Sequence, residues 1–323
     1  MSIRGKRIFL TGGAGFIGAT LVGRLVNDNE IIVYDNFERD SLSSTPYANH
    51  SNLHRITGDV LNQEGLTRAM TGADLAIHMA AIAGVDTVIK NLVATMRVNL
   101  LGTYNFLEAA RTLSRCERVV TFSTSEVFGT YAYRVTEADT VTTGAVGEAR
   151  WTYAVSKLAG EHLTYAYFRE YGLPGVIVRP FNVYGPGQIG EGAIHVFVTR
   201  ALRGEDLVIH GDGDQIRSWI YIDDMVDGLL LAMIKAEAVG ESFNIGNPRG
   251  TITINGLAEL VLSVTGFSSK IVHVPRQAVD VELRIPSIEK ARKLLGFSPR
   301  VDLREGIERT VAWYRDRVEN VRR

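Results

Sequence analysis

The stretch R-I-F-L-T-G-G-A-G-F-I-G, residues 7–18, decides the fold of this 323-residue chain. Its first five residues form an apolar run typical of a buried strand, and the apolar residues after Gly15 recur at helical spacing. The motif G-x-x-G-x-x-G, made by Gly12, Gly15 and Gly18, lies between the two. Glycines at these positions allow a tight turn and let a pyrophosphate approach the backbone and the N-terminus of the helix. The stretch therefore predicts a dinucleotide-binding unit.

The alternation of strands and helices continues through the first 180 residues. Short apolar runs that suit buried strands are separated by longer stretches with helical spacing of apolar residues. Because such strands are typical of a parallel sheet covered on both faces, we expect a doubly wound α/β sheet (Rossmann fold) over residues 1–180. The predicted strands are 7–11, 30–34, 53–57, 75–79, 117–122 and 175–179, and the predicted helices are 15–27, 62–70, 87–113 and 151–171.

The pattern changes after Pro180. Shorter helices and strands mix there with turns rich in glycine and proline, such as F-N-V-Y-G-P-G (181–187) and G-N-P-R-G (246–250). We therefore expect a smaller mixed α/β region over residues 181–323. The apolar stretch near 219–222 is a candidate for a strand that returns to the main sheet.

The amino-acid composition argues against several classes of binding partner. The 35 basic and 36 acidic residues give a net charge of −1, so no net field favours a nucleic-acid backbone. No apolar run approaches the roughly 18 residues of a membrane span, and no secretory signal is visible. We expect a cytoplasmic protein with neither nucleic acid nor membrane as partner. One cysteine and seven histidines without metal-ligand spacing predict no disulfide and no metal, and His78 is expected to be a packed core residue.

Acidic residues at the ends of the next two predicted strands extend the dinucleotide site. Asp35 ends the second strand, where a carboxylate meets the adenosine ribose hydroxyls and repels a 2′-phosphate, which favours NAD over NADP. Asp59 ends the third strand, close to where the adenine is expected, and each of the two could instead be a turn residue. The predicted cofactor-binding residues are Gly12, Gly15, Phe16, Ile17, Gly18, Asp35, Asn36, Asp59, Val60, Ala80, Tyr153 and Lys157.

Two further segments carry candidate catalytic groups. Tyr153 and Lys157 are four residues apart and share one face of the predicted helix 151–171. A lysine ammonium near a phenol lowers the phenol pKa toward neutrality, which makes Tyr153 a candidate general base for hydride transfer. Thr124 and Glu126 follow the fifth strand at the ligand crevice of such a sheet, where Thr124 could bind the reacting hydroxyl and Glu126 could act as acid, base or electrostatic group. The alternative for this segment is a capped strand-to-helix turn.

The chain is similar over essentially its whole length to extended short-chain dehydrogenases/reductases that act on nucleotide sugars. The resemblance implies an NAD that stays bound and is recycled, a nucleotide-sugar-binding region over 181–323, and contacts from Asn182 and Arg217 to the substrate diphosphate. It also implies a homodimer formed by the helices within 87–113 and 151–171. The motifs that carry it are T-G-G-A-G-F-I-G (11–18), Y-x-x-x-K (153–157), R-P-F-N-V-Y-G-P-G (179–187), G-D-G-D-Q-I-R-S-W-I-Y-I-D-D (211–224) and L-G-F-S-P (295–299).

Three segments resemble UDP-glucuronate decarboxylases in particular. They are S-T-S-E-V (123–127), R-W-T-Y (150–153) and E-L-R-I-P-S-I (282–288). The resemblance implies C4 oxidation, loss of CO2 and re-reduction to UDP-xylose. Departures are Phe128 where tyrosine is usual, N-V-Y-G (182–185), and A-G-V (83–85), which is closer to sugar epimerases. The implied catalytic residues are Thr124, Ser125, Glu126, Tyr153, Lys157 and Arg284, the last also contacting the substrate.

Three other activities are alternatives. A UDP-sugar 4-epimerase, acting on UDP-glucuronate or UDP-glucose, would use the same Tyr153 and Thr124. A nucleotide-sugar 4,6-dehydratase would need an acidic pair after the threonine, and Ser125 stands at the first of those positions. A protein of this fold that only senses NAD or binds RNA would be expected to lack Tyr153 or Lys157, or to carry a basic face; both residues are present and the net charge is −1.

Overall fold

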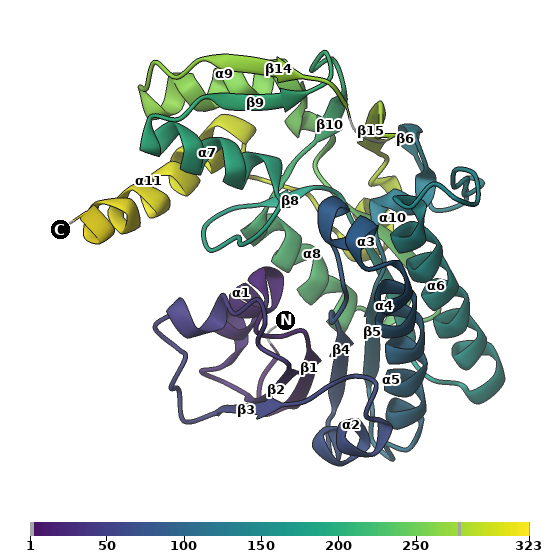
Figure 1. Ribbon diagram of the computed structural model, residues 1–323. Helices are drawn as coiled ribbons and strands as arrows, with labels where there is room; N and C mark the ends of the chain where they lie inside the picture. Colours follow the sequence, from purple (N-terminus) through teal and green to yellow (C-terminus); the bar gives the residue numbers. More distant parts are fainter. Residues whose placement is uncertain (1–2, 277–278, 323) are drawn as a thin grey trace.

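The computed structural model describes residues 3–276 and 279–322 (Figure 1). Its largest element is a seven-stranded sheet in which every neighbouring pair is parallel, in the order β12-β7-β5-β4-β1-β2-β3. All six predicted strands are present. The strands are β1 (Arg7–Thr11), β2 (Glu30–Asp35), β3 (Leu53–Thr57), β4 (Leu75–His78), β5 (Arg118–Phe122), β7 (Gly175–Pro180) and β12 (Ser242–Ile245).

Helices cover both faces of this sheet, which confirms the predicted doubly wound fold. Successive residues of β1 point to opposite faces: Ile8 and Leu10 belong to one core cluster, whereas Phe9 belongs to another. The first cluster packs against α1 (Phe16–Leu25), α8 (Ile222–Ile234) and α10 (Glu289–Leu295). The second packs against α2 (Gln63–Met70), α5 (Gly102–Arg111) and α6 (Trp151–Tyr171).

The predicted single helix over 87–113 is wrong. The structure has α3 (Val85–Lys90), α4 (Leu92–Met96), a π-helical turn (Arg97–Leu101) and then α5. The break lies at Asn91, whose φ of −138° is not helical and whose side chain donates to the Thr87 carbonyl at 2.9 Å. In the π-helical turn, the Asn99 side chain bonds Ile82 and Ser156 instead of lying free on a helix surface. Short polar side chains thus hold both irregularities.

The C-terminal half, joined by one strand from the N-terminal half, forms smaller sheets at one end of the main sheet (Figure 1). One has four strands in the order β13-β10-β15-β6, and two others pair β11 with β8 and β14 with β9. Three helices accompany them. These elements are β6 (Tyr131–Val135), β8 (Val183–Tyr184), β9 (Leu207–His210), β10 (Ile216–Ser218), β11 (Ile220–Tyr221), β13 (Thr251–Thr253), β14 (Ile271–Val274), β15 (Leu283–Pro286), α7 (Ala193–Arg203), α9 (Ile254–Thr265) and α11 (Leu303–Arg322).

The strand that returns to the main sheet is not the one suggested by the sequence. The stretch near 219–222 contributes β11, which pairs with β8 and runs straight into α8. Instead β12 pairs in parallel with β7, and its Phe243 and Ile245 are fully buried. Conversely, β6 comes from the N-terminal half and pairs with β15 of the C-terminal half. Each half therefore contributes a strand to a sheet of the other, and the division at residue 180 stays a prediction.

Within the described part of the chain, no helix combines the length and the apolar character needed to cross a bilayer.

Candidate active site

The predicted site residues gather where the strands of the main sheet end. Strand order reverses at β1, which lies between β2 and β4, and ligands of such sheets bind outside the carboxyl ends at this reversal. Gly12 follows β1, Asp35 ends β2 and Thr124 follows β5. The candidate site therefore lies between the main sheet and the C-terminal elements.

Close contacts with the backbone require glycine at Gly12 and Gly18, and the glycine turn leaves room for a ligand. Gly12 has a φ of +68°, and a Cβ there would lie 2.5 Å from the Ala80 amide nitrogen. A Cβ on Gly18 would lie 2.6 Å from the Gly13 Cα. A Cβ on Gly15, which precedes α1, would meet only the Gly12 carbonyl, at 3.3 Å. The first amides of α1 thus remain open to an anion.

Asp35 connects β2 to this turn. Its two carboxylate oxygens accept hydrogen bonds from the amides of Ala14 (3.0 Å) and Phe37 (2.9 Å). Burial raises its pKa above the ordinary value for aspartate. The carboxylate is therefore fixed beside the glycine motif, where ribose hydroxyls are expected.

The remaining predicted cofactor residues lie after the carboxyl ends of β1, β2, β3 and β4, and their environments differ. Asp59 is exposed and accepts from the Leu61 amide at 2.9 Å, as a turn residue does. Val60 is buried behind it, and the exposed Asn36 pairs with Glu38. Phe16 and Ile17 begin α1, and Ala80 follows β4 against Gly12. These residues fit a bound NAD: the open amides of α1 would hold the pyrophosphate and Asp35 the ribose.

Tyr153 and Lys157 extend from α6 toward the end of β5. The Lys157 side chain is buried, and its Nζ atom donates to the Phe122 carbonyl at 2.8 Å. Burial lowers the pKa of Lys157 to about 8. Tyr153 is half-buried, and Thr124 lies close enough for its hydroxyl to lower the Tyr153 pKa through a hydrogen bond. The structure thus brings the predicted base and hydroxyl together.

The expectation of a phenol pKa near neutrality is wrong for this structure. Burial and the nearby Glu126 carboxylate raise the Tyr153 pKa above its ordinary value, and they outweigh the effect of Thr124. Because the Lys157 ammonium is directed at a backbone carbonyl, it does not offset this effect. Additional positive charge is needed to stabilise the phenolate.

A buried ion pair beneath these residues was not predicted from the sequence. Glu161 follows Lys157 by four residues on α6, and Arg179 holds both of its oxygens, with distances of 2.8 and 2.6 Å. Ser123, which directly precedes Thr124, donates to the same carboxylate. The pair therefore joins α6, β7 and the end of β5. The spacing of Tyr153, Lys157 and Glu161 along one helix face was the available signal.

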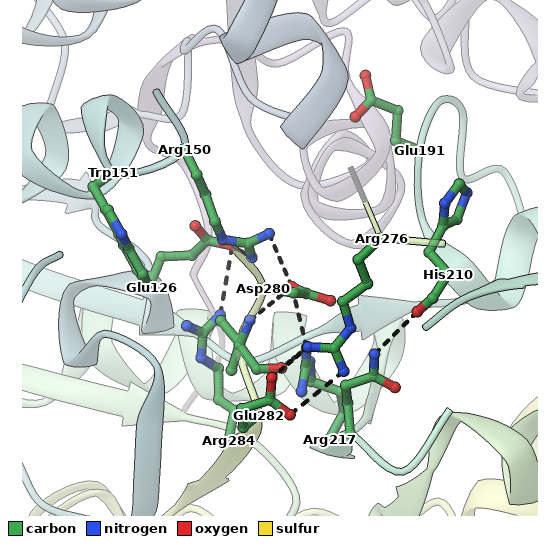
Figure 2. Close-up of polar contacts among 12 residues, drawn as sticks. Glu126, Arg150, Trp151, Glu191, His210, Arg217, Arg276, Asp280, Glu282 and Arg284 are labelled. Carbon is green, nitrogen blue, oxygen red and sulfur yellow. Dashed lines mark hydrogen bonds and ion pairs between the residues drawn. The ribbon is translucent and has the colours of Figure 1, made fainter. Parts of the chain in front are cut away.

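Glu126, the carboxylate that acts on Tyr153, belongs to a chain of alternating charges. Figure 2 shows this chain. Glu126 contacts Arg150 at 3.1 Å and Arg284 at 3.5 Å. Asp280 contacts Arg150 at 2.9 Å and Arg217 at 3.4 Å. Arg217 and Arg284 were predicted from the sequence to contact the substrate, whereas no role was predicted for Arg150 or Asp280. Arg150 lies in the R-W-T-Y segment, but nothing local to Asp280 marks it.

The other predicted substrate residue is placed beside this network. Asn182 has a φ of +37°, and its side chain donates to the Ser218 carbonyl at 2.7 Å. Ser218 adjoins Arg217 on β10, so Asn182 and Arg217 are linked through one strand. Ser125 is buried at the start of the 3₁₀ turn Ser125–Phe128. Contacts of these residues with a substrate stay predictions.

His78 is a core residue. It is almost fully buried, its Nδ1 lies 2.7 Å from the Thr11 hydroxyl, and its ring stacks on Phe106. Burial and the Lys157 charge lower its pKa to about 3. Among residues 3–276 and 279–322, no group of three or more His, Cys, Asp or Glu side chains is arranged to hold a metal.

Comparison with known proteins identifies the family. Residues 8–246 match the NAD dependent epimerase/dehydratase family. A UDP-N-acetyl-alpha-D-glucosaminuronate decarboxylase of Bacillus cytotoxicus is 35% identical, with 98% of this chain and 99% of the relative covered. UDP-glucuronic acid decarboxylase 6 of Arabidopsis thaliana is 36% identical, with 93% and 86% covered. The structure of UDP-glucuronic acid 4-epimerase from Bacillus cereus, in complex with UDP-glucuronic acid and NAD, has a TM-score of 0.88 at 28% identity, with 96% and 99% covered.

The chain belongs to the NAD dependent epimerase/dehydratase family and is an enzyme of that family. The predicted family and the predicted cofactor, NAD, are thereby confirmed. The family match spans all the predicted residues except Arg284, which lies beyond residue 246.

Proposed function

We propose that this enzyme is an NAD-dependent decarboxylase of a UDP-hexuronate, with UDP-glucuronate as the first candidate substrate. One observation carries the proposal: Arg284, only 2% exposed, lies beside Glu126 next to the Tyr153–Thr124 pair. A buried guanidinium suits a substrate that carries a carboxylate close to the reacting carbon. The decarboxylases among the relatives support the same activity.

Oxidation at C4 of the sugar is assigned to Tyr153 and Thr124. NAD, when bound, brings a positive nicotinamide ring and exchanges a hydride with the substrate. The Tyr153 oxygen takes the proton of the C4 hydroxyl, and the Thr124 hydroxyl holds the same substrate oxygen. Lys157 holds α6 against β5, which keeps Tyr153 in position.

Decarboxylation follows from the chemistry of the oxidised sugar. A ketone at C4 is β to the C5 carboxylate, so loss of CO2 leaves an enolate at C4 and C5. Hydrogen bonds from Thr124 and protonated Tyr153 stabilise the enolate oxygen. Arg284 orients the departing carboxylate and assists protonation at C5, where a proton from water takes the place of CO2. Glu126, held by two arginines, keeps these guanidinium groups in place, and Ser125 positions the sugar.

Two alternatives of the same family differ in the groups they require. A 4-epimerase acting on the same hexuronate would use Tyr153 and Thr124 but would have to retain the carboxylate. A 4,6-dehydratase needs a proton donor for the leaving hydroxyl, and the residue after Thr124 is the buried Ser125. Glu126 is engaged by Arg150 and Arg284, which favours an orienting role over proton donation.

We also propose that two copies of the chain form a homodimer. The surface of α3, α4, the π-helical turn, α5 and α6 carries eight of the fifteen exposed large apolar side chains of the described residues, and a homodimer would cover them. Residues 181–323, together with the end of the main sheet, would bind the nucleotide sugar. The exposed side chains are Ile89, Leu92, Val93, Leu101, Tyr104, Val155, Tyr165 and Tyr171.

Product analysis after mixing the purified enzyme with UDP-glucuronate and NAD tests the proposal, using mass spectrometry and proton NMR. A UDP-pentose with loss of CO2 is expected, and the yield of NADH shows whether the hydride returns. UDP-N-acetylglucosaminuronate in a parallel reaction tests the substituent at C2. Tyr153→Phe is the control that should give neither product. A UDP-hexuronate of unchanged mass and inverted C4 would contradict decarboxylation and establish epimerisation.

A further inference from the structure

Arg150 lies next to the catalytic residues but has no role in the reaction described so far. It directly precedes α6, three residues before Tyr153, and it is 8% exposed. One terminal nitrogen lies 3.1 Å from a Glu126 oxygen, and the other lies 2.9 Å from an Asp280 oxygen. Arg150 thus contacts two carboxylates at once, from segments on either side of it in the sequence (Figure 2).

The charges in this network do not balance. Three guanidinium groups, those of Arg150, Arg217 and Arg284, are each at most 8% exposed. Their direct ion-pair partners are two carboxylates, Glu126 and Asp280, so the guanidinium groups outnumber these partners by one. The neighbouring Glu282 also acts on Arg217, but it is itself paired with Arg276. The Nε atoms of Arg150 and Arg284 are buried and have no hydrogen-bond partner among residues 3–276 and 279–322. Because an uncompensated buried charge is costly, the cluster is suited to a further anion.

Asp280 marks where such an anion can lie. One of its oxygens is shared by Arg150 at 2.9 Å and Arg217 at 3.4 Å. Its side chain is 34% exposed, against 19% for Glu126, so it is the carboxylate of the network nearest to solvent. An incoming carboxylate could take its place on Arg150 while Asp280 becomes hydrated. Glu126, held by Arg150 and Arg284, would remain.

We propose that Arg150 binds the sugar carboxylate of the substrate and exchanges its contact with Asp280 for this one. The inference rests on the proposed function, because it requires a hexuronate. The carboxylate is attached at C5, next to the C4 carbon served by Tyr153, and Arg150 lies one helical turn from Tyr153. Arg284 is held by the Gly129 carbonyl at 3.0 Å and by Glu126, so Arg150 would share the carboxylate with Arg284 rather than replace it.

Binding of three ligands to Tyr153→Phe enzyme, which should not turn over, tests this assignment by calorimetry. The ligands are UDP, UDP-glucose and UDP-glucuronate, which share the nucleotide and differ in the sugar and its carboxylate. Adding Arg150→Met should weaken UDP-glucuronate binding at least about tenfold, the loss expected for a charge-assisted contact. The affinities for UDP and UDP-glucose should stay within about threefold. Arg150→Lys should restore part of the loss.

A second variant tests whether the loss of affinity comes from a direct contact between Arg150 and the substrate or from a change at Glu126. In Arg150→Met combined with Glu126→Gln, Glu126 no longer carries a charge that repels the substrate, and Asp280 keeps its ion pair with Arg217. The loss for UDP-glucuronate should therefore persist. Recovery in this double variant would overturn the proposal. Arg118→Met is the matched control, because Arg118 is also buried but donates to the backbone carbonyls of Ala232 and Lys235, at the opposite end of β5.

The remaining outcomes distinguish the inference from the proposed function. Equal losses for all three ligands would show that Arg150 supports the fold or the diphosphate and would overturn the inference alone. If the parent Tyr153→Phe enzyme binds UDP-glucose as tightly as UDP-glucuronate, the site does not recognise a carboxylate. That result would contradict both the hexuronate substrate and the role of Arg150.

Discussion

The Nζ atom of Lys157 lies 2.8 Å from the carbonyl oxygen of Phe122, the last residue of β5. This contact joins the helix that carries Tyr153 to the strand end that carries Thr124. It also buries an ammonium group whose pKa falls to about 8. A residue expected to act mainly on the Tyr153 phenol is therefore also a link between two structural elements.

Burial of Lys157 should make stability depend on pH in a defined direction. Below about pH 8 the lysine is charged in both states and carries its burial cost. Between about pH 8 and pH 10 the unfolded chain holds more protons, so the free energy of unfolding should rise, by up to about 3 kcal/mol. Chemical denaturation of NAD-free enzyme across this range, with Lys157→Met as the reference, measures the difference. If the free energy of unfolding depended on pH in the same way in both proteins, Lys157 would not be the cause of the rise.

His78 should destabilise the enzyme in acid. Its pKa is lowered to about 3, so the unfolded chain takes up a proton below about pH 6.5 that the folded enzyme does not. The free energy of unfolding should therefore fall by about 2–3 kcal/mol more in the parent than in His78→Gln between pH 6.5 and pH 4.5. Denaturant titrations at these two pH values check the prediction. An equal loss in both proteins would mean that other groups cause the acid sensitivity.

The Glu161–Arg179 pair should matter for stability because it is buried. Glu161→Gln leaves the Arg179 charge uncompensated and should cost about 3–5 kcal/mol of unfolding free energy. Replacing both residues, as Glu161→Leu with Arg179→Met, should recover a large part of that loss. Glu117→Gln, which breaks the exposed pair with Lys6, is the control and should cost less than about 1 kcal/mol. Similar effects of the buried and exposed single changes would contradict this account.

Asp35 should set the choice between NAD and NADP. Its carboxylate is fixed by the amides of Ala14 and Phe37, where it would repel a 2′-phosphate. Asp35→Ser should lower the ratio of NAD to NADP affinity at least about tenfold, because a charged contact becomes a neutral one. Asp59→Ser, at the exposed turn after β3, should change this ratio little. Titration of both dinucleotides would show the assignment to be wrong if the two variants behaved alike.

The proposed homodimer can be tested on the exposed apolar helices. Val93 is 75% exposed and Leu101 is 48% exposed. A charge at either position, as in Val93→Glu or Leu101→Glu, should shift the enzyme from dimer to monomer in light scattering. Phe267→Glu changes an exposed apolar residue that follows α9 and should leave the dimer intact. A parent enzyme that is already monomeric at micromolar concentration would rule the dimer out.

The part of the site that could be predicted from the sequence is local. The turn from Gly12 to Gly18 and the pair Tyr153–Lys157 each lie within a few residues, so chain geometry alone brings their members together. The predicted bounds of α6, residues 151–171, agree with the structure for the same reason, since Gly172 ends the helix in the left-handed conformation. The break at Asn91 was missed because it depends on side-chain hydrogen bonds that helical periodicity does not reveal.

The sequence by itself determined the dinucleotide turn, the parallel sheet and the Tyr153–Lys157 face, because each follows from short-range periodicity and backbone freedom. Only the tertiary structure decided that β12 joins the main sheet, that β6 leaves for the C-terminal sheet, and that Arg150 meets Asp280, 130 positions away. Pairing of buried charges depends on which segments are packed together. No spacing along the chain encodes that proximity.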